Sequence, residues 1–335
     1  MSDSGANVAS PAGTHGPMGT AKASTTGTST AVVCPVCPHH CRLREGGLGL
    51  CRARRNVNGT VIAENYGRLT SIAMDPIEKK PIAEWHPGGT VLSVGSYGCN
   101  LRCPFCQNWE ISQAGPDDHG AAGKSTTAGH GTVAVDDPHG NGSRAVPWHE
   151  VAPEELAALA MEACREDSRM LGVAYTYNEP LVGWEYVRDT ARLVHAADLA
   201  NVLVSNGCAA EPVIDELAPL IDAVNIDLKS FSPAFYRTCG GDLDQVKRTI
   251  VRLAAEPGCH LEVTTLAVTD ANDSEAEMEA IASWLASVDP EIVLHVTRFF
   301  PRWRMQDRGP TPVDRVYHLA NIARRHLPHV HVGNC

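Results

Sequence analysis

Three cysteines lie close together at Cys99, Cys103 and Cys106, with Phe105 just before the last of them. An iron–sulfur cube normally takes four thiolates, one for each iron. Three thiolates would leave one iron without a protein ligand and free to bind another molecule. The alternative is a zinc knuckle, which needs a fourth Cys or His nearby. No Cys or His occurs in the dozen residues that follow, so the spacing favours an iron–sulfur cluster with one open position.

A second group of cysteines precedes the first, at Cys34, Cys37, Cys41 and Cys51. Four thiolates suit zinc and an iron–sulfur cluster equally well by number. We favour a structural metal site that holds residues 32–60, a segment too short for a core of its own. An auxiliary cluster that relays electrons is one alternative, and four unmetallated thiols are another.

Composition excludes several classes of protein. The chain has 335 residues, 43% of them hydrophobic, and a net charge of −11, which argues against nonspecific nucleic-acid binding. There is no apolar run of the roughly 20 residues that cross a bilayer, and no secretory signal is apparent. Twelve cysteines in a chain of this size indicate metal binding or chemistry, and we expect a cytoplasmic protein without a membrane partner. Residues 1–31 are rich in Ser, Thr, Gly and Ala and are predicted to be a disordered tail.

The rest of the chain alternates between apolar strands and amphipathic helices. A strand at 91–97 leads into the three cysteines, and the Gly-, His- and Asp-rich residues 114–147 are predicted to be a flexible surface insertion. Further strands are expected at 171–176, 201–205, 223–228, 261–266, 292–296 and 329–332. Helices are expected between them at 153–165, 184–197, 213–220, 243–255, 274–287 and 313–325. This order predicts an α/β fold with a parallel sheet, a partial or full (β/α) barrel over residues 85–335.

Polar residues follow the predicted strands, at the edge where such folds place their function. Glu179 could accept a hydrogen bond from an ammonium group or simply cap the next helix. Asp227 and Lys229 share one face of their strand and could bind a ligand or pair with each other. The fifth strand carries Glu262 and Thr264, and we expect them to reach this edge. The sixth strand is expected to contribute His295, Thr297 and Arg298.

Four segments together resemble one known family. GCNLRCPFCQNWEIS at 98–112, YNEP at 177–180, NIDLK at 225–229 and RFFP at 298–301 look like the radical S-adenosylmethionine (SAM) enzymes of the AmmeMemoRadiSam system, relatives of pyruvate formate-lyase-activating enzymes. The resemblance spans residues 34–334 except for 114–147. It implies a [4Fe-4S] cluster on Cys99, Cys103 and Cys106, with S-adenosylmethionine on the open iron.

The same resemblance implies further contacts with the cofactor. Phe105 would lie against the adenine, and Asn178 and Glu179 stand where activating enzymes carry Gly-Gly-Glu, so that Glu179 would contact the methionyl ammonium. Asp227 and Lys229 match positions near the cofactor. The chain departs from the family pattern at Tyr177-Asn178, which replaces two glycines and puts the backbone contacts there in doubt.

The implied reaction is reductive cleavage of S-adenosylmethionine to methionine and a 5′-deoxyadenosyl radical, with electrons from a donor of flavodoxin or ferredoxin type. The radical would act on a protein or small-molecule substrate that the sequence does not identify. One alternative is an activase for a glycyl-radical enzyme. Two others belong to different classes, a noncatalytic zinc-binding scaffold and a thiol oxidoreductase that uses Cys34 and Cys37.

Overall fold

The computed structural model describes residues 31–116, 129–137 and 142–335, and its centre is a sheet of eight strands. The strand order is β15-β14-β13-β12-β11-β10-β7-β6, in which all pairs are parallel except β6 with β7. The strands are β6 (Ser71–Pro76), β7 (Thr90–Gly95), β10 (Met170–Tyr175), β11 (Ala200–Ser205), β12 (Ala223–Asp227), β13 (His260–Ala267), β14 (Val293–Arg298) and β15 (Val330–Gly333). The predicted α/β fold is therefore confirmed.

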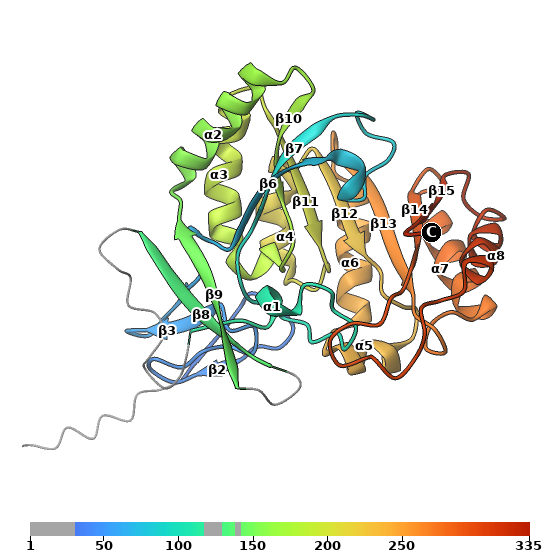
Figure 1. Cartoon of the computed structure of the whole chain (residues 1–335), viewed down its shortest axis with the longest axis horizontal. Coiled ribbons are helices and arrows are strands. Elements are labelled where there is room, and N and C mark those ends of the chain that lie inside the picture. The colour runs from blue at the N-terminus through green and yellow to red at the C-terminus, as the bar shows by residue number, and fades with distance from the viewer. Residues whose placement is uncertain (1–30, 117–128, 138–141) are drawn as a thin grey trace, which may run out of the picture.

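The sheet does not close into a full barrel. Its two edges are β6 and β15, which do not pair with each other in the described part of the chain. The partial barrel is thus the version of the prediction that the structure adopts. Figure 1 shows the helices on the outer side of the sheet, with α1, α5 and the N-terminal strands near the ends at which the parallel strands finish.

The helices begin where the sequence supplies caps. Pro153, Glu154 and Glu155 form the first turn of α2, and the side chain of Asp242 accepts a hydrogen bond from the Gln245 N–H at the start of α6. The larger helices are α2 (Pro153–Glu166), α3 (Trp184–Ala196), α4 (Glu211–Leu217), α6 (Leu243–Ala254), α7 (Glu275–Val288) and α8 (Val313–Ala323). Their bounds agree with the predicted ranges to within a few residues. Two short helices, α1 (Trp109–Ser112) and α5 (Pro233–Cys239), were not predicted.

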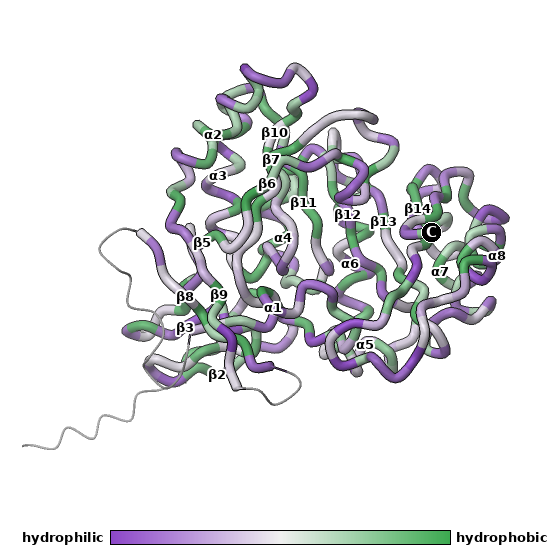
Figure 2. Tube along the Cα trace, viewed as in Figure 1, coloured by the Kyte–Doolittle hydropathy of each residue, from purple (hydrophilic) through white to green (hydrophobic). Residues whose placement is uncertain are grey.

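The central strands are buried on both faces, which explains their nearly continuous apolar sequences. In β7, Leu92 and Val94 belong to the large core that includes the helices. The neighbouring Val91 packs on the opposite face with Ile77 and Ile82. These strands form the hydrophobic centre of the trace in Figure 2.

Residues 77–85 fill the inner side of the sheet, and we call them the plug. They include a 3-10 turn at Ile77–Lys79. The Asn225 amide donates to the carbonyl of Pro81 at 2.6 Å, and the Glu262 carboxylate accepts the backbone N–H groups of Ala83 and Glu84 at 2.9 Å. The plug is therefore fixed to β12 and β13 by buried hydrogen bonds.

Glu262 and His295 do not lie at the functional edge, so this expectation was wrong. Glu262 is five residues before the end of β13, and its carboxylate contacts the imidazoles of His260 and His295. Both residues lie deeper in the sheet because β13 and β14 continue to Ala267 and Arg298. Glu262 instead binds the backbone of the plug, and His295 binds the Glu262 carboxylate.

The range 114–147 is also different from its prediction in the part that the structure describes. β8 (His130–Asp136) and β9 (Ser143–Glu150) form an antiparallel pair, and β9 joins β5 (Arg68–Leu69). Val133, Val135 and Trp148 are buried between this small sheet and its neighbours. A few alternating apolar residues thus suffice for an ordered hairpin. Residues 117–128 and 138–141 lie outside the described residues, and so do residues 1–30 of the tail predicted at 1–31.

Four short strands organise the N-terminal segment, β1 (Val32–Val33), β2 (Arg42–Leu43), β3 (Arg54–Val57) and β4 (Thr60–Ala63). Val36 and Leu43 are buried in the same core as Leu101 and Phe105. The segment therefore packs against the three-cysteine loop. Among the described helices, none has the length and apolar character needed to cross a membrane.

The buried Glu262 gives a prediction for stability. Burial acts to raise the pKa of Glu262, but hydrogen bonds from His260, His295 and the plug backbone outweigh it and lower the pKa to about 2. A lowered carboxyl pKa stabilises the fold above the unfolded value near 4.5, and this contribution is lost as the pH falls toward 2. We expect Glu262→Gln to lower the free energy of unfolding at pH 7 by roughly 2–4 kcal/mol.

The same variant should lose less stability than the wild type between pH 5 and pH 3, because it lacks the titrating group. Urea unfolding followed by circular dichroism at several pH values measures both effects, with the exposed Glu155→Gln as the matched control. Equal pH slopes for the wild type and Glu262→Gln would contradict the prediction.

Candidate radical SAM site

The loop after β7 carries the three cysteines, and hydrogen-bond partners from this loop and from the turn after β11 reach two of their sulfur atoms. The Leu101 N–H points to Cys99 Sγ at 3.3 Å, and the Asn206 amide reaches the same sulfur at 3.7 Å. Cys106 Sγ lies 3.3 Å from Ser112 Oγ at the end of α1. Such donors favour the thiolate form that a metal ligand needs.

Without a metal, the surroundings favour neutral thiols. Burial raises the pKa of Cys99 well above its usual value, and the nearby Glu179, Cys103 and Cys106 add to the shift. Burial likewise raises the pKa of Cys106, and the charge of Cys103 adds to it. Binding of a cationic iron–sulfur core would reverse these shifts, because it stabilises the thiolate form. This donor set fits a three-thiolate iron–sulfur cluster.

Glu179 supplies a buried carboxylate beside the cysteines. It is 2% exposed and accepts hydrogen bonds from Ser205 Oγ and the Asn206 N–H, both at 2.8 Å, and from the Leu181 N–H at 3.0 Å. Burial raises the pKa of Glu179 to about 7 despite these donors. No ion pair holds this carboxylate in the described part of the chain, so a positively charged ligand group would find a prepared partner here.

Asn178 holds the backbone of the preceding loop. Its Oδ1 accepts the Ser96 N–H at 2.9 Å, and its Nδ2 donates to the carbonyls of Tyr97 and Gly98 at 3.2 and 3.0 Å. Both polar ends of the side chain are therefore engaged with the loop that precedes Cys99. The geometry makes Asn178 a positioning residue for that loop.

Tyr177 occupies the first of the two positions at which the family pattern has glycine. Its φ of 71° lies in the left-handed region that glycine adopts without strain. Its hydroxyl donates to Asp75, and Lys80 Nζ lies 5.1 Å from the centre of its ring. These two contacts stabilise a tyrosine in the left-handed backbone conformation that glycine adopts more easily.

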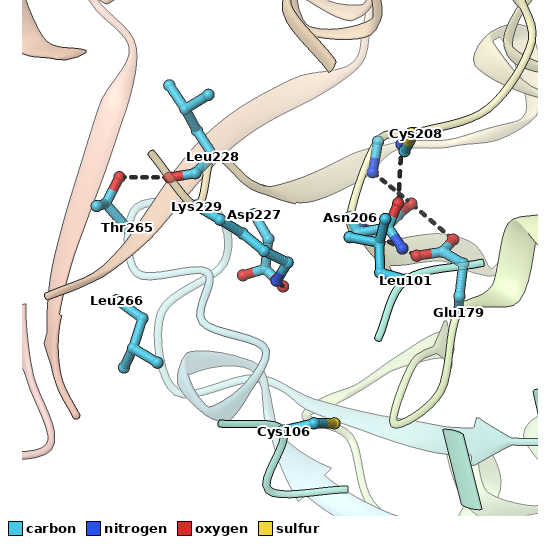
Figure 3. A network of polar contacts seen from close by, with 12 residues as sticks. Leu101, Cys106, Glu179, Asn206, Cys208, Asp227, Leu228, Lys229, Thr265 and Leu266 are labelled. Carbon is cyan, nitrogen blue, oxygen red and sulfur yellow. Dashed lines mark hydrogen bonds and ion pairs between the residues drawn. The ribbon is translucent and has the colours of Figure 1, made fainter. Parts of the chain in front are cut away.

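Asp227 and Lys229 come from the end of β12 and form the ion pair that was one of the two predicted alternatives. Lys229 Nζ lies 3.0 Å from Asp227 Oδ2, and Asp227 remains 39% exposed. Burial alone would lower the pKa of Lys229, but the charges of Asp227 and Cys103 raise it well above its usual value. Figure 3 shows this pair with Glu179, Asn206 and Cys106, which reach the same region from separate elements.

Phe105 is 7% exposed, and its ring centre lies 6.0 Å from that of Phe235 on α5. The sequence analysis did not identify a further neighbour of these cysteines, the buried Cys239 at the end of α5. A hydrogen bond between the thiols of Cys239 and Cys103, together with burial, raises the pKa of Cys103 well above its usual value. The two residues are 136 positions apart, so no local spacing could have indicated their contact.

The four N-terminal cysteines also come together. Burial raises the pKa of Cys51 to about 12, and the charges of Cys37 and Cys34 add to the shift. Burial raises the pKa of Cys37 too, with further contributions from Cys34 and Cys41. Cys41 Sγ accepts the Leu50 N–H at 3.4 Å. Among the described residues, no group of three or more Cys, His, Asp or Glu side chains is arranged as a formed metal site, so a metal at these four cysteines stays a prediction.

Gly98 allows the two cysteine groups to touch. The Cys99 N–H donates to the carbonyl of Cys51 at 3.2 Å. A Cβ on Gly98 would lie 2.6 Å from that carbonyl oxygen, and its φ is 90°. Only glycine fits both constraints.

Comparison with known families agrees with this geometry. The sequence model of the radical SAM superfamily matches residues 93–285, which include the three cysteines, Glu179 and Lys229. The chain belongs to the radical SAM superfamily. Members are enzymes of radical chemistry that use a [4Fe-4S] cluster and S-adenosylmethionine.

One sequence relative and two solved structures are similar to this chain. The uncharacterized protein MJ0808 of Methanocaldococcus jannaschii is 33% identical over 305 residues, which are 90% of this chain and 81% of that protein. A radical SAM methyltransferase from Sphaerobacter thermophilus shares the fold with a TM-score of 0.50 at 17% identity, over 74% of this chain and 67% of the other. A domain of a pyruvate-formate lyase-activating enzyme from Bacteroides vulgatus aligns with a TM-score of 0.43 at 20% identity, over 49% of this chain and 99% of that domain.

The contact at Gly98 leads to a prediction. We expect Gly98→Ala to destabilise the protein by roughly 1–3 kcal/mol more than Gly88→Ala, because the added Cβ at position 98 would meet the Cys51 carbonyl oxygen. Gly88 is the matched control, since its φ is 80° and no atom lies within 4 Å of its added Cβ. Thermal unfolding and iron content after anaerobic purification measure the difference. Similar losses in the two variants would show that the close approach is unimportant.

Proposed function

We propose that Cys99, Cys103 and Cys106 hold the [4Fe-4S] cluster of this enzyme and that Glu179 receives the methionyl ammonium of S-adenosylmethionine. The observation that carries the proposal is the buried Glu179 carboxylate, which has three hydrogen-bond donors but no ion-pair partner among the described residues, and whose charge acts on the thiol of Cys99. When bound, the cluster supplies the electron that cleaves the sulfonium to methionine and a 5′-deoxyadenosyl radical.

The residues of this chain would orient the cofactor rather than perform the chemistry. Asn206 links the two halves of the site, because its N–H donates to Glu179 while its side chain reaches Cys99 Sγ. Asn178 keeps the loop before Cys99 in place. Asp227 and Lys229 would add polar contacts, and Phe105 would lie against the adenine. The buried setting would keep water and other hydrogen donors away from the radical.

We further propose that the chain is a member of the AmmeMemoRadiSam group, on the four sequence segments at 98–112, 177–180, 225–229 and 298–301. Its substrate would then be a protein or a small molecule of that system, and its reductant a flavodoxin or ferredoxin. Activation of a glycyl-radical enzyme is the alternative reaction of the same site.

The test of the cleavage reaction uses anaerobically purified, reconstituted protein. We expect brown protein that forms 5′-deoxyadenosine from S-adenosylmethionine after dithionite reduction. Cys103→Ala should lose the product and the iron of this cluster. Colourless wild-type protein with zinc and no iron would instead support a noncatalytic scaffold.

Glu179 can be tested separately through cofactor binding. A charged hydrogen bond of about 1.5–3 kcal/mol corresponds to a roughly 10–100-fold change in affinity, so we expect Glu179→Gln to weaken S-adenosylmethionine binding by that factor. Iron content should stay constant, since the side chain does not ligate the cluster. Equilibrium dialysis measures binding, with Glu155→Gln as the isosteric control on the surface of α2. Unchanged affinity would exclude the proposed role.

A further inference from the structure

Four exposed arginines lie on or beside the loop that carries the three cysteines. One belongs to the loop itself, one to α5, and the other two follow β14. We call Arg102, Arg237, Arg302 and Arg304 the arginine surface. Its members come from three distant parts of the chain, so the sequence alone gives no sign that they belong together.

Backbone hydrogen bonds bring these three parts of the chain to one place. The Arg102 N–H donates to the carbonyl of Cys239, the last residue of α5, at 2.7 Å. The Arg304 N–H donates to the carbonyl of Pro104, which follows Cys103, at 3.0 Å. Figure 1 shows α5 and the segment between β14 and α8 near each other, below the ends of the parallel strands. The four arginines therefore lie around the same loop.

The positive charge of the arginine surface is not neutralised by the chain itself. Within residues 31–116, 129–137 and 142–335, none of the four side chains forms an ion pair with an acid. Arg302 Nη1 donates to the carbonyl of Pro301 at 3.1 Å, and the Arg304 guanidinium lies 4.4 Å from the centre of the Trp303 ring. Both contacts leave the full positive charge in place.

The acids nearest to these arginines along the chain are engaged with other groups. Glu110 of α1 pairs with Arg144, and Asp307 pairs with Arg308. Asp242 caps the start of α6, where its carboxylate accepts a backbone N–H. These carboxylates are therefore not available to the arginine surface in this structure.

Exposed arginines on the helices are arranged differently. Arg192 pairs with Glu216 at 2.8 Å, and Arg248 pairs with Glu211 at 3.0 Å. The whole chain has a net charge of −11, so four unpaired cations around one loop stand out against an acidic molecule. Such a surface attracts acidic proteins, and the attraction is screened over about 10 Å at 0.1 M salt.

The arginine surface is continuous with the proposed cluster loop. Arg102 lies between Cys99 and Cys103 in the sequence, and the side chains of Cys99 and Cys106 are only half-buried. A protein bound to Arg102 would contact this loop with no helix or strand of the chain between them. The cluster takes up one electron for each cleavage, so its loop is where an electron carrier has to bind.

We propose that the arginine surface is the docking site of an acidic one-electron carrier protein, an inference that rests on the proposed function. Guanidinium groups suit this role, because their planar donors bind carboxylates in a bidentate manner. One electron passes from the reduced carrier, which is oxidised, to the oxidised cluster, which is reduced. No bond or proton changes place in this step. Dithionite, a small inorganic donor, does not depend on the arginine surface.

Binding of a flavodoxin gives the first test. A flavodoxin with a net negative charge is titrated anaerobically into the reconstituted wild-type protein. Arg237→Glu with Arg302→Glu reverses two charges outside the cysteine loop, so it should weaken binding roughly tenfold or more and leave the iron content unchanged. The charge-matched control is Arg165→Glu with Arg325→Glu, at exposed positions on and near α2 and α8, which should bind almost as well as the wild type.

Two results of the titration would overturn the docking site. One is an equal loss of affinity in the two double variants, which would reflect net charge alone. The other is a wild-type affinity that does not fall as salt is raised from about 50 to about 200 mM, because a site made of exposed charges is screened by salt.

The rate of cluster reduction gives the second test. It is followed by the loss of visible absorbance of the cluster, in the absence of S-adenosylmethionine and with flavodoxin below saturation. Arg237→Glu with Arg302→Glu should be reduced by flavodoxin roughly tenfold more slowly than the wild type, and by dithionite at the same rate. An unchanged rate with flavodoxin, or an equal loss with both donors, would contradict docking at the arginine surface.

Dithionite-driven cleavage separates this proposal from the proposed function. A wild type that forms 5′-deoxyadenosine with dithionite, but whose reduction by flavodoxin does not depend on the arginine surface, would overturn the docking site alone. A wild type that is reduced but forms no 5′-deoxyadenosine with dithionite would instead contradict the proposed function itself.

Discussion

The buried carboxylate of Glu179 is the constraint around which this end of the sheet is arranged. The carboxylate oxygens accept hydrogen bonds from the turn after β11. The backbone N–H of Glu179 donates to the Gly98 carbonyl at 3.4 Å. The ends of β7, β10 and β11 are therefore held together by the backbone and the side chain of one residue. Burying such a charge without a cation costs free energy. The fold carries this cost at a position where a cationic ligand would remove it.

Much of the architecture follows from local sequence. The parallel strands are buried on both faces and the helices are capped by acids, prolines or serines, so apolar runs and cap residues mark both kinds of element. The plug could not be predicted in this way, because residues 77–85 depend on contacts with Asn225 and Glu262 far along the chain. The β8–β9 hairpin was missed because its few apolar residues lie among Gly, His, Asp and Ser, a composition typical of loops.

In the candidate site, too, local patterns could be predicted from the sequence and long-range contacts could not. The spacing of Cys99, Cys103 and Cys106 is a local pattern, and it indicated the chemistry directly. Alternation along a strand indicates the face of a residue but not its depth, so Glu262 and His295 were placed at the wrong level of the sheet. The contact between Cys103 and Cys239, and the contact between the two cysteine groups, depend on the tertiary fold alone.

The tyrosine at position 177 limits the order in which mutations can accumulate at this turn. A glycine there would adopt the left-handed conformation freely, whereas a tyrosine introduced alone would add about 1–2 kcal/mol of strain. Asp75 and Lys80 offset that strain through the hydroxyl and the ring. An evolutionary path from glycine to tyrosine is therefore easiest when the acid and the lysine are already in place. In the reverse direction, losing Asp75 or Lys80 before position 177 returns to glycine would lower the stability of the protein.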